Sequence, residues 1–268
     1  MRQFFLTILI IVLAGVAGFG LYHYFEEDEL KDELTEAREY MRHRDFMEAE
    51  KSFERYLRRN PDGDDRWEVW NNLVDLALNV RHNRTSAIEI LEAMLVEYDI
   101  SSKERRIVQE RLAEEYELMR RYERAMELWM ALEKDKETPD LQRAGIYRSM
   151  ARIYLRRLEF ELAKESLELC LELEIPQSAK SECRYDLADA YMVMEDLESG
   201  ISELRTILQQ DGVDDELRVL SIFMLADALE QQGSKKDALS LFESIRHSYP
   251  NLSVIEARIE YLKEGDRD

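Results

Sequence analysis

Proline is scarce in this chain of 268 residues, which contains only four. None interrupts a long helical pattern, and all four lie in short joints: Pro61, Pro139, Pro176 and Pro250. No run alternates between apolar and polar residues, so no strand is expected. Basic residues are outnumbered by acidic ones, 37 to 58. The net charge of −21 therefore argues against binding to nucleic-acid phosphates or to anionic lipid surfaces.

Residue patterns that carry chemistry are missing as well. The four histidines are scattered along the chain, without the neighbouring ligands that a metal site at helical spacing requires. The sequence has no phosphate-binding loop, no nucleophile elbow and no cysteine pair at zinc spacing. We therefore expect no enzyme activity, no catalytic residue, no metal site and no cofactor.

A six-fold internal repeat is the main feature that the sequence does contain. Small residues recur every 38 or 37 positions: Ala49, Ala87, Ala125, Ala163, Gly200 and Ala238. A second series lies twelve positions upstream: Ala37, Asp75, Ala113, Ala151, Ala188 and Ala226. This period predicts stacked helix hairpins, in which small residues let two helices approach closely. Asp75 and Gly200 depart from the alanine pattern, so repeats two and five are expected to pack less regularly.

These positions resemble the tetratricopeptide repeat family. The third repeat, for example, contains Ala113, Tyr116 and Trp129 at the family's spacing. The family period is about 34 residues, and the surplus here falls between the second helix of one repeat and the first helix of the next. The resemblance implies an all-α, right-handed α-solenoid of six helix pairs over residues 26–251, with a capping helix and polar tail over 252–268. It also implies a scaffold for protein–protein interactions.

Residues 1–25 predict a transmembrane anchor or an uncleaved signal. The stretch from Phe4 to Phe25 contains no Asp, Glu, Lys or Arg and is long enough to span a bilayer. Arg2 precedes it and acidic residues follow, which predicts a cytoplasmic N-terminus and exported repeats. The alternative is a signal peptide cleaved near Ala14 to Ala17. Both interpretations favour a bacterial protein whose repeats lie in the periplasm, and the first makes it a single-pass protein of the inner membrane.

In the family that the chain resembles, the first helix of each repeat lines a concave binding surface. The resemblance assigns that surface to Arg148, Arg152, Arg156, Tyr185, Asp189, Met192 and Phe223. The arginines, four residues apart, would form one row that binds carboxylates or phosphates. Alternatively, the row pairs with acidic residues of the preceding helix, namely Glu110, Glu114 and Glu117. The apolar members would form a patch for a partner segment, or they belong to the core.

The only two cysteines, Cys170 and Cys183, flank a joint that contains Pro176. If the two adjoining helices run antiparallel, the sulfurs lie at similar heights and a disulfide is within reach. Export to an oxidising compartment would allow that bond to form. The alternative is two separately buried thiols, because cysteine often serves as a small apolar core residue.

Taken together, these patterns predict a membrane-anchored scaffold that binds other proteins or peptide segments in the bacterial cell envelope. Assembly, export and chaperone-like roles all fit this description. A homo-oligomer is compatible with the small residues Ala14 and Gly18 in the anchor. The alternative function is a cytosol-facing membrane receptor that binds chaperones or precursor proteins. The set of lysine and asparagine residues by which family members bind chaperone tails is not found, which weighs against this alternative.

Overall fold

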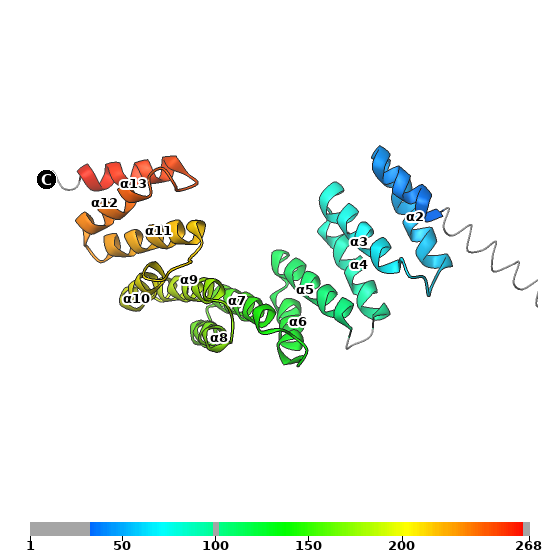
Figure 1. The fold of residues 1–268 in the computed structure, drawn as a ribbon, viewed down its shortest axis with the longest axis horizontal. Helices are drawn as coiled ribbons and strands as arrows, with labels where there is room; N and C mark the ends of the chain where they lie inside the picture. The colour runs from blue at the N-terminus through cyan, green and yellow to red at the C-terminus, as the bar shows by residue number, and fades with distance from the viewer. Residues whose placement is uncertain (1–32, 99–101, 265–268) are drawn as a thin grey trace, which may run out of the picture. The chain divides into compact units, whose positions relative to one another are not determined.

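The computed structural model describes residues 33–98 and 102–264. The predicted anchor over residues 1–25 and the last four residues, 265–268, lie outside the described part. Within that part the chain forms helices joined by turns and contains no strand, which confirms the all-α prediction (Figure 1). None of the helices described is both long enough and apolar enough to cross a membrane.

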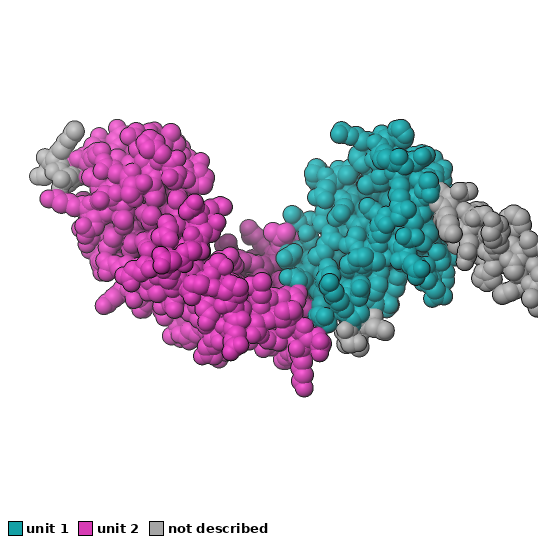
Figure 2. Space-filling model, viewed as in Figure 1, with its two compact units in different colours: residues 1–115 teal, residues 116–268 magenta. Residues whose placement is uncertain are grey.

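The chain divides into two compact units, residues 1–115 and 116–268, and each is described by itself (Figure 2). Unit 1 begins its described part with helical residues 33–43. Its further helices are α2 (Phe46–Arg59), α3 (Arg66–Asp75), the π-helical η1 (Leu76–Val80), α4 (Arg84–Glu97) and most of α5 (Lys103–Leu118). Its first two repeats share a core formed by Leu34, Ala37, Ala49, Phe53, Tyr56, Leu57, Val69, Leu73 and Leu76.

The described part of unit 2 contains the end of α5 and eight further helices. These are α6 (Tyr122–Lys134), α7 (Asp140–Arg156), α8 (Phe160–Glu172), α9 (Gln177–Val193), α10 (Leu197–Leu208), α11 (Asp215–Gln231), α12 (Lys235–Ser244) and α13 (Leu252–Glu264). From α6 onward each helix packs against the next along the chain, and α9 also contacts both α7 and α11. The first helices of successive repeats therefore form one layer, and α8, α10 and α12 form the other.

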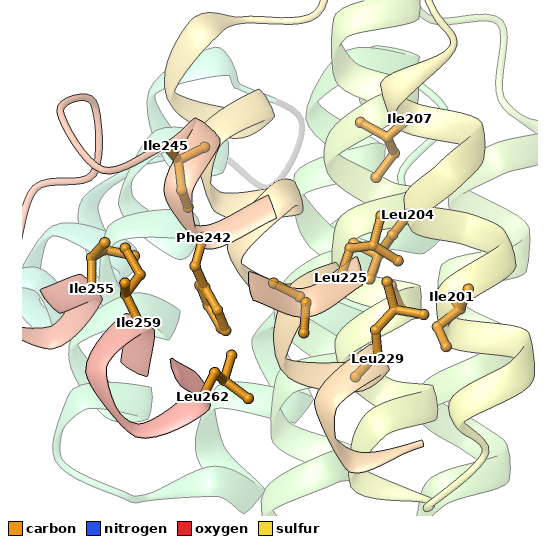
Figure 3. Packing of buried hydrophobic residues seen from close by; sticks show 14 of the residues in the cluster. Ile201, Leu204, Ile207, Leu225, Leu229, Phe242, Ile245, Ile255, Ile259 and Leu262 are labelled. Carbon is orange, nitrogen blue, oxygen red and sulfur yellow. The ribbon is translucent and has the colours of Figure 1, made fainter. Parts of the chain in front are cut away.

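The small residues of both repeat series are buried, as the repeat predicts. Every alanine in the two series is at most 1 % exposed. In the last repeat, Phe242 packs inside a larger apolar cluster. Figure 3 shows its ring between Leu225 and Leu229 of α11 on one side and Ile255 and Ile259 of α13 on the other. The final helix thus covers the apolar side of α12, as a capping helix requires.

The turn between the two helices of a repeat is built in the same way throughout. One residue in each turn has a positive φ, between 51° and 91°: Arg44, His82, Arg120, Leu158, Glu195 and Gly233. In five turns the following residue donates its N–H to the carbonyl five positions earlier, at 2.8–2.9 Å: Asp45 to Tyr40, Arg121 to Tyr116, Glu159 to Tyr154, Asp196 to Tyr191, and Ser234 to Leu229. This left-handed cap ends the first helix and fixes the spacing to the second.

Repeat two is the exception, as the departure at Asp75 predicted. Asp75 is exposed, and the helix continues as the π-helical turn η1. The N–H of Asn83 reaches the carbonyl of Ala77, six positions earlier, at 2.8 Å. The aspartate lies directly before the π-turn and forms an ion pair with Arg111 of α5, at 3.1 Å, instead of packing between the two helices as the alanines of the other repeats do.

Candidate functional site

The predicted arginine row lies along α7, and two of its three members bind neighbouring helices. Arg148 donates to α9, where its Nε lies 2.6 Å from Asp186 Oδ2 and its guanidinium also contacts Glu182. Arg152 binds Glu117 at the end of α5 through two nitrogens, one of them at 3.1 Å. Arg152 therefore pairs as expected with the first helix of the preceding repeat, α5. Arg148 instead binds the first helix of the following repeat, α9. These two arginines link successive repeats.

Arg156, at the end of the row, is exposed and has no hydrogen bond or ion pair with the described residues. Asp189 lies on α9, the first helix of the following repeat, and is also exposed. It too has no hydrogen bond or ion pair with the described residues. Burial of its surroundings raises the pKa of Asp189, the nearby Asp186 carboxylate raises it further, and Arg156 lowers it in part. The guanidinium of Arg156 thus affects the pKa of Asp189, and both side chains remain exposed for contact with another molecule.

Tyr185 lies one helical turn before Asp189 on α9. Burial raises the pKa of its phenol to about 12, and the carboxylates of Asp189 and Asp186 contribute to that rise. The phenol therefore stays neutral around pH 7, where its hydroxyl can both donate and accept hydrogen bonds.

Phe223 of α11 belongs to an aromatic group at the edge of the unit 2 core. Its ring stacks on Tyr249 with centroids 4.6 Å apart and meets the edge of Phe242 at 5.5 Å. Phe223 and Tyr185 are both partly buried and pack against the core. Each residue therefore contributes one side to the core and leaves another accessible. Tyr249 was not predicted, although an aromatic residue in an otherwise polar joint is a usable signal.

Met192 packs against the core, which is the second of the two interpretations given for the apolar members. A Cβ added to Gly200 of α10 would lie 2.5 Å from the Met192 Cε. The methionine therefore fills the space left by the missing alanine in repeat five. This packing explains why Gly200 distorts neither α9 nor α10, both of which are regular α-helices. Met192 contributes to the helix pair rather than to a surface shared with Tyr185 and Phe223.

Cys170 of α8 and Cys183 of α9 form a disulfide in the structure, with their Cα atoms 6.1 Å apart. Both residues are completely buried. The bond joins the second helix of repeat four to the first helix of repeat five.

We define the first-helix surface as the accessible parts of α7, α9 and α11 that carry the predicted site. Its residues are Arg148, Arg152, Arg156, Tyr185, Asp189 and Phe223. The sequence patterns did not predict Glu182 and Asp186 as the two acidic partners of Arg148. Their four-residue spacing on α9 matches that of the arginines on α7, and this spacing could have identified them.

Comparison with known proteins gives a family match and several similar folds. The model of the tetratricopeptide repeat family matches residues 34–101 and 185–253, slightly more than half of the chain. No curated protein sequence matches the chain significantly.

Three solved structures illustrate the similarity in fold. PilF of Pseudomonas aeruginosa is 14% identical, with 90% of this chain and 99% of that chain covered and a TM-score of 0.56. PilW, described as a widely conserved type IV pilus biogenesis factor, is 15% identical, with coverages of 84% and 97% and a TM-score of 0.59. The repeats of a putative kinesin light chain from Podospora anserina are 20% identical, with coverages of 74% and 98% and a TM-score of 0.56. At these identities the likeness concerns the fold alone.

Proposed function

Because the chain belongs to the tetratricopeptide repeat family, we propose that it is a non-enzymatic scaffold that binds a segment of another protein on the first-helix surface. The observation that carries the proposal is the pair of exposed, oppositely charged side chains of Arg156 and Asp189, which have no hydrogen-bond or ion-pair partner in the described chain. Arg148 and Arg152 hold neighbouring repeats together, so their ion pairs explain them without a ligand.

The chemistry of this surface fits a peptide better than a small anion. Arg156 offers a planar guanidinium to a carboxylate, and Asp189 accepts hydrogen bonds from amide or basic groups. The accessible sides of Tyr185 and Phe223 add aromatic area beside these charges. Aromatic anchors with a charged rim are typical of protein interfaces.

Site-specific photo-cross-linking in intact cells tests this proposal. A photoreactive amino acid at position 156 or 223 should cross-link the full chain to a partner protein. Position 169 is the matched control, because Leu169 is an exposed residue on α8, in the other layer of the same unit. Equal cross-linking to the same partner from position 169 would contradict the proposal, as would an absence of adducts at both test positions.

We also propose that residues 1–25 anchor the scaffold in the inner membrane and that its repeats lie in the periplasm. Arg2 before the apolar stretch and the acidic residues after it support this orientation. The disulfide supports it as well, since such bonds persist mainly in oxidising compartments. PilW takes part in pilus biogenesis, and a role in assembling a structure of the cell envelope is the corresponding proposal for this chain.

A further inference from the structure

Leu158 stands out among the six turn residues with positive φ. It is the only large apolar residue among them, and its φ is 61°. Non-glycine residues rarely adopt this conformation, and glycine or asparagine fits it better. The Leu158 side chain is also 71 % exposed, so it buries little apolar surface in return. Neither the backbone conformation nor the exposure helps the fold, which suggests a role in binding.

Leu158 lies in an apolar depression at the edge of unit 2. The depression has a volume of about 610 Å³, and its apolar lining comes from Leu158, Phe160 and Leu162 on one side and from Val193 and Met194 on the other. Leu162 and Val193 are 43 % and 48 % exposed. We call this feature the turn-edge depression. It joins the turns of repeats four and five, and it contains none of the residues of the first-helix surface.

Three glutamates line the turn-edge depression, namely Glu159, Glu161 and Glu195, and the segments around them are acidic as well. Segments 157–165 and 195–198 together carry six acidic and two basic residues, an acidic excess of four. The two basic groups are already engaged, because Arg157 lies 2.9 Å from Glu159 and Lys164 lies 3.4 Å from Glu161. The rim therefore presents net negative charge around an apolar centre.

The negative charge of the rim disfavours some of the molecules that could bind in the depression. A second copy of the chain would bring the same acidic rim against itself, and anionic lipid would be repelled. We propose that the turn-edge depression is a second docking site, for an amphipathic segment of a partner protein in which lysine or arginine flanks a large apolar side chain. The apolar residue enters beside Leu158, and the basic residues contact the glutamates of the rim. This site adds to the first-helix surface and does not depend on it.

A binding assay with the full chain tests the proposal. The probe is a fluorescein-labelled amphipathic helix of about 14 residues, made only of leucine and lysine, compared with a peptide in which glutamate replaces lysine. Leu158→Gly removes the apolar side chain and suits the left-handed backbone. This variant should keep or raise the melting temperature but weaken binding of the lysine peptide by at least about tenfold. Leu141→Ser, at a residue 58 % exposed in the same unit, should bind like the original protein.

Three outcomes would overturn the proposal. The first is unchanged affinity in Leu158→Gly, and the second is equal affinity for the glutamate peptide. The third is an equal loss in Leu141→Ser, because binding would then depend on exposed apolar side chains in general rather than on the depression. Light scattering tests whether a second copy of the chain binds in the depression. A dimer of the original protein that is lost in Leu158→Gly would assign the depression to a second copy of the chain and would likewise contradict the proposal.

Discussion

At the scale of single residues, two glycines have opposite roles. Gly233 occupies the left-handed turn position with a φ of 91°, so Gly233→Ala should lower the free energy of unfolding by about 1 kcal/mol. Gly145 lies inside α7, and no other atom lies within 4 Å of the point that an added Cβ would occupy. Gly145→Ala should therefore raise the free energy of unfolding by about 0.5–1 kcal/mol. Urea unfolding of the two variants measures both signs. Destabilisation by Gly145→Ala would contradict the account of the helix glycine, and unchanged stability in Gly233→Ala would contradict that of the turn glycine.

Arginines in one row should also differ in what their loss does. Arg148→Gln removes two contacts to α9 and should reduce the free energy of unfolding by about 1 kcal/mol. Arg156→Gln removes no such contact and should leave stability unchanged while weakening partner capture. Thermal unfolding together with cross-linking yield separates the two effects. If Arg156→Gln destabilises the protein as much as Arg148→Gln, the end of the row is structural.

Asp189 predicts a stability change that depends on pH. The surrounding protein partly desolvates its accessible carboxylate, and this effect, together with the nearby Asp186, raises the pKa of Asp189 in the folded protein. The folded state therefore binds the proton more tightly than the unfolded state. Stability should then fall as the pH rises from the ordinary aspartate pKa through the raised value. Asp189→Asn should therefore be more stable than the original protein at pH 7, and the difference should vanish in acid below the ordinary aspartate pKa. Denaturant unfolding at several pH values measures this, and a gain that persists in acid would contradict it.

The sequence predicted buried residues better than surface contacts. Alanine at a fixed period has few interpretations other than close helix packing, and these alanines are buried. The partner of Arg148 could not be chosen in the same way, because acidic residues are abundant on both neighbouring helices and helix rotation decides which ones meet. Leu158 was missed for another reason. Leu158 stands four residues after Tyr154, a spacing that also fits a continuing helix. Its positive φ, which makes it unusual, cannot be inferred from the sequence.

At the scale of helices, the disulfide between α8 and α9 makes a measurable contribution. Unfolded, unreduced protein should contain no titratable thiol, because both cysteines are bonded. Reduction should lower the free energy of unfolding by about 3 kcal/mol for a loop of this length in the chain-entropy model. The double variant Cys170→Ala, Cys183→Ala is the control and should not respond to reductant. Two free thiols in protein purified without reductant would contradict the bond.

The repeat period predicts where the helices of a repeat end, but it does not predict the hydrogen bonding of each turn. The nine-residue spacing from Tyr154 to Ala163 recurs because one backbone hydrogen bond closes the turn between them. The aspartate at position 75 correctly marked repeat two as irregular. Its form, a π-turn at unchanged repeat length, could not be predicted, because a side-chain pattern does not reveal which carbonyl accepts the hydrogen bond.

At the scale of the whole molecule, the predicted topology can be tested directly. When the full chain is expressed in a Gram-negative bacterium, protease added to spheroplasts should digest the repeats. The orientation follows from Arg2 and from the acidic residues after the apolar stretch. A cytoplasmic marker protein should remain intact in the same sample. Digestion of the repeats only after lysis would place them in the cytosol and would favour the receptor alternative.

The uniform turn has a consequence for how such a chain can change its length. Five of the six turns close with an N–H to carbonyl bond of the same span. A gene duplication that starts and ends at equivalent turn positions would therefore insert one complete repeat without disturbing the caps on either side. Repeat two has the same length as its neighbours, so a copy of it would fit equally well, and its descendants should remain recognisable by a π-turn at the same place. The left-handed turn residue is thus a natural recombination point.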